Sequence, residues 1–557
     1  MSFFQQAPKL NNQFEADPLL REYLERIFPA DVRKAIEPEL REMGELAAGE
    51  LFQLSLTSRK DEPQLVSFDP WGRRIDEIRV PPAWKIFAKL AAEKGLVGIP
   101  YEAKHGRYSR VHQFASAYLF APSSSVYTCP LAMSDGAVRT LMTHKNNALI
   151  ERAVPRLISR DPSRAWTSGQ WMTERTGGSD VGLSETRAAR DGQGWRLFGT
   201  KWFTSATTSE MTLTLARPEG NSTGGKGLAL FYLELRGPDG KLNGLRINRL
   251  KEKLGTKMLP TAEIELDGSR AELVAGSSDG VKAISPMLQI TRTWNALCSI
   301  ASMRRGLALA TDYARQRHAF GAPLSQKPLH LQTLAELQTQ FEASFLLTFR
   351  AVELLGLEEA NEATDRERLL LRALQPIVKL WTAKQAVWNA SEVLEAFGGA
   401  GYVEDTGLPV LLRDAQVLPI WEGTTNVLAL DMLRALSQPG ALEAVADELT
   451  ARANTGTRAE LREARRSVAV ALDRTMERLR RPQNEHPNSL EGFARAIALT
   501  LGRAWALALL LEHGEWVLSR GGPRRTALAA RQLGASDPNF LDGVLATEEA
   551  ARLALGY

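Results

Sequence analysis

The chain has 557 residues, of which 44% are hydrophobic and 24% are charged, and its formal net charge is +4. This length exceeds what one hydrophobic core supports and predicts three or four globular domains. The small net charge does not by itself indicate a nucleic-acid or membrane partner. Cys129 and Cys298 lie far apart, without CxxC spacing or neighbouring histidines. We therefore expect two buried thiols in a reducing compartment and no metal site.

The N-terminal segment MSFFQQAPKLNNQFEADPLL lacks the basic start and apolar core of a signal peptide. No stretch of the sequence approaches about 20 uncharged apolar residues, so we expect no membrane span. These features predict a cytoplasmic protein.

Amphipathic helices are predicted first, from about residue 17 to 158, because apolar residues recur with helical spacing in AWKIFAKLAAEKGLV and GAVRTLMTHKNNALIERAV. Short β-rich runs separated by turn residues follow: WRLFGTKWFTS, MTLTLAR, GLALFYLEL and TAEIELDG. Helical spacing returns in ALCSIASMRRGLALATDYARQR and PLHLQTLAELQTQFEASFLLTFRAVELL, and SQPG marks a boundary before a last helical segment. The predicted domains are 1–164 (helical), 165–282 (β), 283–440 (helical bundle) and 441–557 (extra helical domain).

Four motifs could carry chemistry, although each by itself is more typical of ordinary structure. QWMTERTGGSDVG suits a backbone that approaches a flat or phosphorylated ligand, but it is neither a GxGxxG fingerprint nor a P-loop. In GTKWFTS, Trp202 and Thr204 are two residues apart on a predicted strand, so we expect them to share a face. In YARQRHAFG, Arg317 stands near a helix end, where it could pair with a phosphate or lie on the surface.

The fourth motif runs from EAFGGAGYVED to LPIWEGTTNV. Its pair Gly398 and Gly399 could cradle an anion or simply end a helix. Glu422 stands directly after Ile420 and Trp421, although acidic side chains usually lie on solvated faces. This unusual placement makes Glu422 a candidate functional residue.

The order and spacing of these motifs resemble the signature series of the FAD-dependent acyl-CoA dehydrogenases over residues 50–440. The matching positions are Thr173, Ser179, Trp202, Thr204, Glu252, Gly255, Arg317, Phe320, Gly321, Gly398, Gly399, Gly401, Glu422, Gly423 and Thr424. The resemblance implies an α+β protein with the acyl-CoA dehydrogenase fold. That fold has an N-terminal α-helical domain, a central β-barrel or sheet domain and a C-terminal four-helix bundle, here followed by an extra C-terminal helical domain.

In that family a carboxylate removes the α-proton of an acyl thioester while the β-hydrogen leaves as hydride to flavin N5. Glu422 matches the base of those members in which it follows an Arg-Asp segment, here Arg413 and Asp414. Other members carry the base just before an arginine that matches Arg292, where this chain has Thr291. The resemblance therefore implies Glu422 as the catalytic base, partly removed from water.

FAD is the cofactor that the resemblance implies, with Trp202 stacking near its ring and Thr204 reaching N5. Arg317 and Phe320, with the glycine pair, are expected to approach the FAD of a neighbouring subunit, which implies a homotetramer. Ser179 and Arg434 are expected along the channel for an acyl-CoA or other small substrate. The expected cofactor-binding residues are Gln170, Met172, Thr173, Gly178, Ser179, Trp202, Phe203, Thr204, Arg317, Phe320, Gly398, Gly399, Trp421, Gly423, Thr424 and Asn426.

Four positions depart from the family pattern. Arg175 replaces the proline common after the Thr-Glu pair, and Trp421 replaces the tyrosine common before the base. Glu395 and Pro328 stand where glutamines are common. The usual cofactor contacts at these positions are therefore left open.

MTERTGGSDV, FGGAGYVED, IWEGTTNVLALDMLR and the early LNNQF are most similar to the adaptive-response (AidB-like) branch, as is the extra C-terminal domain. That branch implies weak or uncertain acyl-CoA dehydrogenase activity and binding of double-stranded DNA, in connection with alkylation damage. Residues 441–557 hold sixteen arginines, no lysine and fifteen acidic residues. All-arginine usage suits phosphate contact, although arginine-rich helical surfaces laced with glutamate are usually solvated or face another subunit. With the branch resemblance, we expect DNA contact at Arg520, Arg524, Arg525 and Arg531.

The resemblance to this branch thus implies a DNA-binding flavoprotein with weak or uncertain acyl-CoA dehydrogenase activity, and protection of DNA from alkylating agents as its expected role. Two alternatives remain open at this point. The first is a dedicated acyl-CoA dehydrogenase with Glu422 as its base and no DNA role. The second is an inactive scaffold of the same fold, against which the presence of Glu422 argues.

Overall fold

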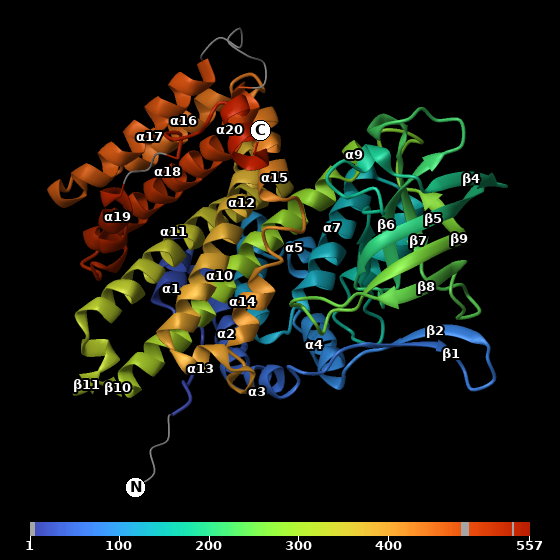
Figure 1. Ribbon diagram of the computed structural model, residues 1–557, viewed down its shortest axis with the longest axis horizontal. Coiled ribbons are helices and arrows are strands. Elements are labelled where there is room, and N and C mark those ends of the chain that lie inside the picture. The colour runs from blue at the N-terminus through green and yellow to red at the C-terminus, as the bar shows by residue number, and fades with distance from the viewer. Residues whose placement is uncertain (1–5, 481–488, 537–539, 557) are drawn as a thin grey trace. The chain divides into compact units, whose positions relative to one another are not determined.

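The computed structural model describes residues 6–480, 489–536 and 540–556, and the chain separates into two compact units (Figure 1). We call the first the helical unit; it comprises residues 1–48, 105–119 and 295–557. We call the second the barrel unit; it comprises residues 49–104 and 120–294. Each unit is described by itself below.

The barrel unit is organised around a sheet that closes on itself. Strand β6 pairs in parallel with β4, and the antiparallel pairs β4–β5, β5–β9, β9–β7 and β7–β6 complete the cycle. Strand β3 adds in parallel to β6, and β8 adds antiparallel to β9. This arrangement confirms the expected central β domain. The strands are β3 (Ser168–Trp171), β4 (Arg187–Asp191), β5 (Gly194–Ser205), β6 (Met211–Pro218), β7 (Ala229–Glu234), β8 (Leu245–Leu250) and β9 (Thr261–Leu273).

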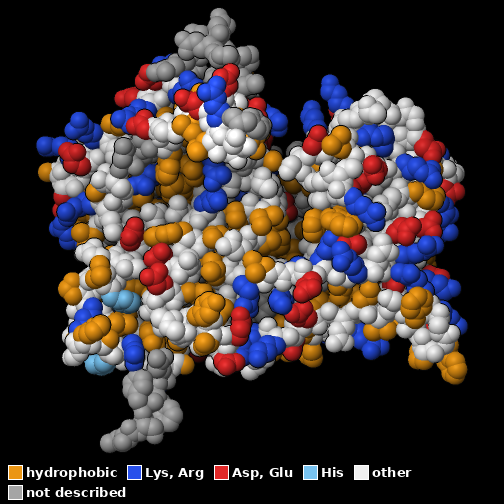
Figure 2. Space-filling model, in the orientation of Figure 1, with side chains coloured by type: hydrophobic (Ala, Val, Ile, Leu, Met, Phe, Trp, Pro, Cys, Tyr) orange, Lys and Arg blue, Asp and Glu red, His pale blue; other side chains and the backbone are white. Residues whose placement is uncertain are grey.

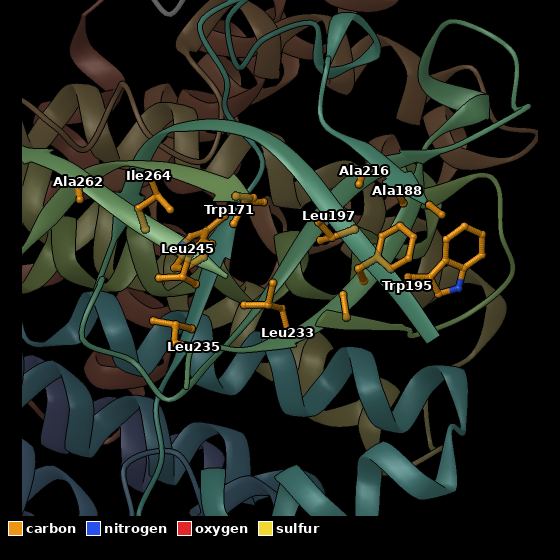
Figure 3. Packing of buried hydrophobic residues seen from close by; sticks show 14 of the residues in the cluster. Trp171, Ala188, Trp195, Leu197, Ala216, Leu233, Leu235, Leu245, Ala262 and Ile264 are labelled. Carbon is orange, nitrogen blue, oxygen red and sulfur yellow. The ribbon is translucent and has the colours of Figure 1, made fainter. Parts of the chain in front are cut away.

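The barrel core is apolar and is filled from successive strands (Figure 3). Leu197, Leu233 and Ile264 are fully buried there, because every second side chain of a strand points to the same face. Trp195 and Phe231 add an edge-to-face aromatic pair with ring centroids 5.6 Å apart. Each such buried aliphatic side chain contributes about 1.5–3 kcal/mol, so the barrel is a rigid support for the loops that leave it.

Helices flank the strands of the barrel unit, with α7 packed against β3 and α9 against β7. The predicted helix over 136–154 is two helices, since Lys145 adopts a left-handed backbone conformation (φ +53°) and Asn146 caps the second helix through Leu149 N. Cys129 is buried in α7, whereas Cys298 is only partly buried, so the expectation of two buried thiols is half correct. The helices are α3 (Glu50–Thr57), α4 (Pro82–Glu93), α5 (Ile99–Glu102), α7 (Thr128–His144), α8 (Asn147–Leu157) and α9 (Gly280–Ala283).

A β-hairpin interrupts the region that the sequence predicts as helical. It consists of β1 (Gln64–Phe68) and β2 (Arg74–Arg79). Asp69 Oδ1 closes the turn by accepting hydrogen bonds from Trp71 N at 2.9 Å and Arg73 N at 2.8 Å. This side-chain turn chemistry, which helical periodicity does not detect, favours a hairpin here.

The helical unit is built on long antiparallel helices. Helix α12 packs against α11, α14 and α15, and it begins with a capping box in which Thr364 and Glu367 each bond the other's backbone. The helices up to residue 440 are α1 (Pro18–Ile27), α2 (Ala30–Ala48), α6 (Ser109–Phe120), α10 (Ser285–Gln316, in this unit from residue 295), α11 (Pro328–Glu359), α12 (Asp365–Ala396), α13 (Gly399–Tyr402), α14 (Pro409–Ala415) and α15 (Thr425–Leu436), with the two-residue strands β10 (His318–Ala319) and β11 (Ala322–Pro323).

Among the described residues after 440, five α-helices join the helical unit. One of them, α18 (Ser489–Ser519), packs against α11, α12 and α15 as well as its own neighbours, so it joins the bundle core. By length and composition alone α18 is apolar enough to cross a membrane, although it includes Arg495 and Arg503 and is therefore not an uncharged stretch. Its apolar window is 89% buried inside the protein, as in a core helix. The others are α16 (Ala441–Ala453), α17 (Arg462–Arg480), α19 (Arg525–Ala535) and α20 (Thr547–Leu555).

A chain of largely buried ion pairs joins α16 and α18 to α11 and α1 of the same unit. Glu448 accepts from Arg350 at 2.9 Å and from Arg452 at 2.6 Å, and Glu512 pairs with Arg452 and with Arg26. Burial by itself would raise the pKa of the Glu448 carboxyl. The flanking arginines Arg350 and Arg452 outweigh burial and hold this pKa below its usual range. Because breaking such a network leaves a buried charge unpaired, many arginines of this segment serve packing.

Candidate active site

The loop after β3, residues 172–182, is tied to the barrel by a buried ion pair. Lys201 Nζ donates to Glu174 Oε1 at 2.7 Å and to the Leu215 carbonyl oxygen at 2.7 Å, and both charged side chains are almost fully buried. Glu174 Oε2 also accepts from Glu185 N at 2.7 Å and Thr186 N at 3.2 Å. Burial alone would raise the pKa of Glu174, but the ammonium and these donors lower it. The loop therefore has a fixed point at its base.

Trp202 and Thr204 lie on β5 where its pairing with β9 is irregular. The register shifts between Lys201 and Thr204, and the side-chain exposure changes from buried Lys201 to partly exposed Trp202 and buried Thr204. The simple alternation that placed Trp202 and Thr204 on one face is therefore wrong at this point, because a bulge adds a residue to one strand. The Thr204 hydroxyl donates to the Ala262 carbonyl at 2.9 Å, and its proposed contact with flavin N5 stays a prediction.

The indole of Trp202 is held by cations. Lys251 Nζ lies 3.6 Å from the ring centroid, and Arg175, the residue that departs from the family proline, lies 5.3 Å away. Trp202 N also donates to the Thr173 carbonyl at 2.9 Å, which joins the strand to the loop. Phe203 is 54% exposed beside the same lysine. Thr173, Trp202 and Phe203 therefore meet at one junction of loop and strand, whereas the roles of the other residues predicted between Gln170 and Thr204 stay a prediction.

Glu422 lies on the turn between α14 and α15, in the helical unit. Its backbone is left-handed (φ +58°) and that of Gly423 is also positive (φ +105°), a conformation that is rare for a residue with a side chain. The side chain is partly buried, as expected for a base that works away from bulk water. Unusual backbone of this kind clusters at functional sites, which favours a functional role for this turn.

Two side chains that the sequence analysis did not single out hold this turn. Lys379, fully buried on α12, donates from Nζ to the Gly423 carbonyl at 2.6 Å. Asn295, buried on α10, donates from Nδ2 to the Leu418 carbonyl at 3.2 Å. The available signal was Lys379 itself, since a lone lysine interrupts the apolar run PIVKLW.

The N-terminus of α15 follows directly. Thr424 is its N-cap, is exposed and makes no side-chain capping bond, so the first amides of the helix are open to an acceptor. Asn426 Oδ1 accepts from Arg495 at 3.4 Å, and Arg434 is exposed in the last turn. Trp421 is partly buried, and its buried indole Nε1 finds no hydrogen-bond acceptor among the described residues.

The other predicted cofactor residues of the helical unit lie at the ends of its long helices. Gly398 (φ +61°) and Gly399 follow α12, and within the described ranges no atom lies within 4 Å of where a Cβ would stand on either. Arg317 follows α10, and Phe320 is 97% exposed on the β10–β11 turn. These open surfaces are those expected of residues that meet another molecule.

Taken unit by unit, the residues present fit FAD. The barrel unit offers exposed backbone at Gly178 and Ser179 beside a fixed indole. The helical unit offers an uncapped helix N-terminus, which favours a phosphate group, and an open glycine pair. Predicted site residues thus lie together at two places. One is the junction of Thr173 and Trp202 in the barrel unit, and the other is the turn that carries Glu422 in the helical unit.

The arginines expected to contact DNA are mostly bound to carboxylates. Arg525 donates to Glu22 at 2.7 Å and to fully buried Glu342 at 2.6 Å, and it is itself only a quarter exposed. Arg520 pairs with Glu25 at 3.1 Å and Arg524 with Glu460, whereas Arg531 is exposed. On the face shown in Figure 2, basic and acidic side chains are interspersed over these helices. This arrangement favours packing over a basic patch.

Four family models match successive parts of the chain. They are the adaptive response protein AidB N-terminal domain over residues 5–162, the acyl-CoA dehydrogenase middle domain over 169–269, the acyl-CoA dehydrogenase C-terminal domain over 278–437, and the acyl-CoA dehydrogenase 11 C-terminal domain-like model over 441–532. The boundaries between these matches fall close to residues 165, 275 and 440.

Known relatives extend along most of the chain. Acyl-CoA dehydrogenase family member 11 of Caenorhabditis elegans is 44% identical, over 92% of this chain and 85% of that protein. AidB of Escherichia coli is 32% identical, over 79% of this chain and 80% of that protein. The solved structure of C. elegans ACDH-11 in complex with C11-CoA has a TM-score of 0.94 and covers 99% of this chain and 96% of its own, at 40% identity. The chain therefore belongs to the family of FAD-dependent acyl-CoA dehydrogenases, in its AidB-like branch.

Proposed function

We propose that this protein is a dedicated acyl-CoA dehydrogenase that introduces an α,β double bond into an acyl thioester. The Glu422 carboxylate takes the α-proton, and bound FAD supplies the oxidant that accepts the β-hydrogen as hydride. The substrate thus loses one proton and one hydride, and the product is the enoyl thioester. The single observation that carries this proposal is the turn that presents Glu422, partly buried, on a backbone fixed by Lys379 and Asn295.

The residues of this chain prepare that transfer. Partial burial keeps water from competing for the Glu422 carboxylate, and a base in such a setting removes a weakly acidic proton more readily. The ion pair of Glu174 and Lys201 holds the loop that carries Thr173 and Ser179, so the binding surface is formed before substrate arrives. A rigid, preformed site is what an oxidation of an unactivated acyl chain needs.

The substrate class that we propose is a medium-length straight-chain acyl-CoA. Its support is the C. elegans relative, whose structure was solved with C11-CoA. A second candidate, protection of DNA against alkylation, is supported by the likeness to AidB at 32% identity and by the match to the AidB N-terminal domain model. The ion pairs of Arg520, Arg524 and Arg525 argue against it, so we favour the dehydrogenase.

We further propose that the protein works as a homo-oligomer, in keeping with the tetramer expected from the sequence. Large apolar side chains are exposed in the helical unit at Phe320 (97%), Tyr402 (89%) and Leu329 (82%), and they are available to an interface between subunits. Light scattering after size-exclusion chromatography should give a multiple of 61.4 kDa. A Phe320→Glu variant that left this mass unchanged would remove the phenylalanine from the proposed interface.

Anaerobic titration of the flavin-loaded protein with saturated acyl-CoA thioesters of 4 to about 18 carbons tests the proposed activity. Loss of the flavin absorbance near the middle of this series, with the enoyl-CoA found by mass spectrometry, is the expected result. Flavin that stays oxidised with every thioester would overturn the proposal. Duplex DNA added to the same protein, at low and high salt, tests the second candidate.

A further inference from the structure

We propose that Lys379 is a positioning residue for the base: its ammonium group fixes the backbone of the turn that carries Glu422. The inference rests on the proposed role of Glu422. It assigns a function to a buried charge on α12 that no motif of the sequence contains.

The burial of Lys379 calls for an explanation. Its side chain is fully buried, and the four nearest residues along the chain, Ile377, Val378, Leu380 and Trp381, are buried and apolar. An ammonium group in such a place is strongly unfavourable unless its protons are hydrogen-bonded. The carbonyl oxygen of Gly423, 2.6 Å away, accepts one of them. A methionine would fill the same space without this cost, so the charge is present for what it binds.

The atom that Lys379 binds belongs to the peptide directly after the base. Glu422 and Gly423 both have positive φ angles, and a side-chain-bearing residue leaves that region unless its surroundings hold it there. Lys379 holds the turn from its far end, and Asn295 holds the near end through the Leu418 carbonyl. The base therefore stands between two anchors that come from long, rigid helices, α12 and α10.

The consequence is chemical. A base must reach the α-carbon of the thioester within a few tenths of an ångström, and displacement by about 1 Å can lower the rate about 100-fold. Loss of the Lys379 anchor lets the turn relax toward ordinary backbone angles and moves the Glu422 carboxylate. We therefore expect the larger effect on kcat and the smaller effect on KM.

The test compares Lys379→Met with Lys384→Met, a lysine on the same helix that is partly exposed. Stopped-flow flavin reduction by saturating acyl-CoA should be about 10- to 100-fold slower in Lys379→Met, with KM within about threefold and flavin content normal. Lys384→Met should match the wild type. Reduction at the wild-type rate by Lys379→Met would overturn the inference.

A second probe separates proton removal from hydride transfer. A 3-thia-acyl-CoA can lose its α-proton but has no β-hydrogen to give, and its deprotonated form produces a long-wavelength band with the flavin. We expect that band to weaken in Lys379→Met, whereas a merely structural loss would leave it intact in the folded fraction. If Lys379→Met does not fold, Lys379→Gln decides: its shorter side chain should not reach the Gly423 carbonyl, so reduction should slow, and a wild-type rate would overturn the inference.

These outcomes are distinguishable from failure of the proposed function. If the wild-type protein is not reduced by any acyl-CoA, the dehydrogenase proposal fails and this inference fails with it. If the wild type is reduced and Lys379→Met is equally fast, only the inference fails.

Discussion

Lys201 Nζ lies 2.7 Å from Glu174 Oε1, and neither side chain has appreciable contact with solvent. The pair joins the middle of β5 to the loop that carries Thr173 and Ser179. Burial lowers the pKa of the Lys201 ammonium from its ordinary value, and the carboxylate opposes that shift. The two groups therefore depend on each other for their charge.

Replacing Lys201 by Met should leave Glu174 as a buried, uncompensated charge. We expect the free energy of unfolding to fall by about 3–5 kcal/mol, and flavin retention to fall with it, because the loop loses its fixed point. Urea unfolding and the flavin-to-protein absorbance ratio measure these effects. The double variant Lys201→Met/Glu174→Gln should recover part of the stability, and a single variant within about 1 kcal/mol of wild type would contradict the role of the pair.

His513 makes the helical unit sensitive to acid. It is fully buried on α18 and stacked on Trp516, and Glu22 lies 4.0 Å from its Nε2. Burial, together with Arg26 and Arg525, lowers its pKa from 6.5 to about 2. The unfolded chain therefore binds a proton between these values that the folded protein does not.

Because the folded-state pKa is the lower one, stability is complete above about pH 6.5 and is lost as the pH falls below it. His513 should contribute a slope of about 1.4 kcal/mol per pH unit in that range. Thermal unfolding of His513→Phe, compared with wild type from pH 7 to 5, isolates this contribution. Parallel profiles of the two proteins would show that His513 does not titrate as described.

Arg525 and Arg531 should behave differently, although both were expected to contact DNA. Arg525→Met removes the partner of buried Glu342 and should destabilise the protein by about 3–5 kcal/mol. Arg531→Met, at an exposed position, should change stability by less than about 0.5 kcal/mol. Chemical unfolding measures both. If the protein instead binds duplex DNA with a steep salt dependence, and Arg531→Met abolishes this binding, the hypothesis of DNA contact at Arg531 would be supported.

Much of the fold could be predicted from the sequence, because its signals are periodic. Strands such as β5 and β9 and helices such as α10 and α11 lie where apolar spacing predicts them. The β1–β2 hairpin was not predicted, because its turn depends on one side chain, Asp69, and not on a periodic spacing of apolar residues.

The site was predictable only in part. The base turn and the barrel junction follow from motifs, but the bulge after Lys201 breaks the alternation on which Trp202 and Thr204 were placed. Lys379 and Asn295 donate hydrogen bonds to backbone carbonyls more than 40 residues away along the chain. Because every residue has a backbone carbonyl, the sequence does not indicate which one is bound. Arg525 looked basic because its carboxylate partners, Glu22 and Glu342, are distant along the chain.

The most direct measurement is anaerobic flavin bleaching of Glu422→Gln by the best acyl-CoA substrate, beside wild type and the exposed control Glu443→Gln. The amide keeps the size of the side chain but cannot take a proton. The proposed mechanism predicts normal flavin content and bleaching about 100- to 10,000-fold slower than wild type, with Glu443→Gln unchanged. A Glu422→Gln protein that bleaches at the wild-type rate would contradict Glu422 as the base.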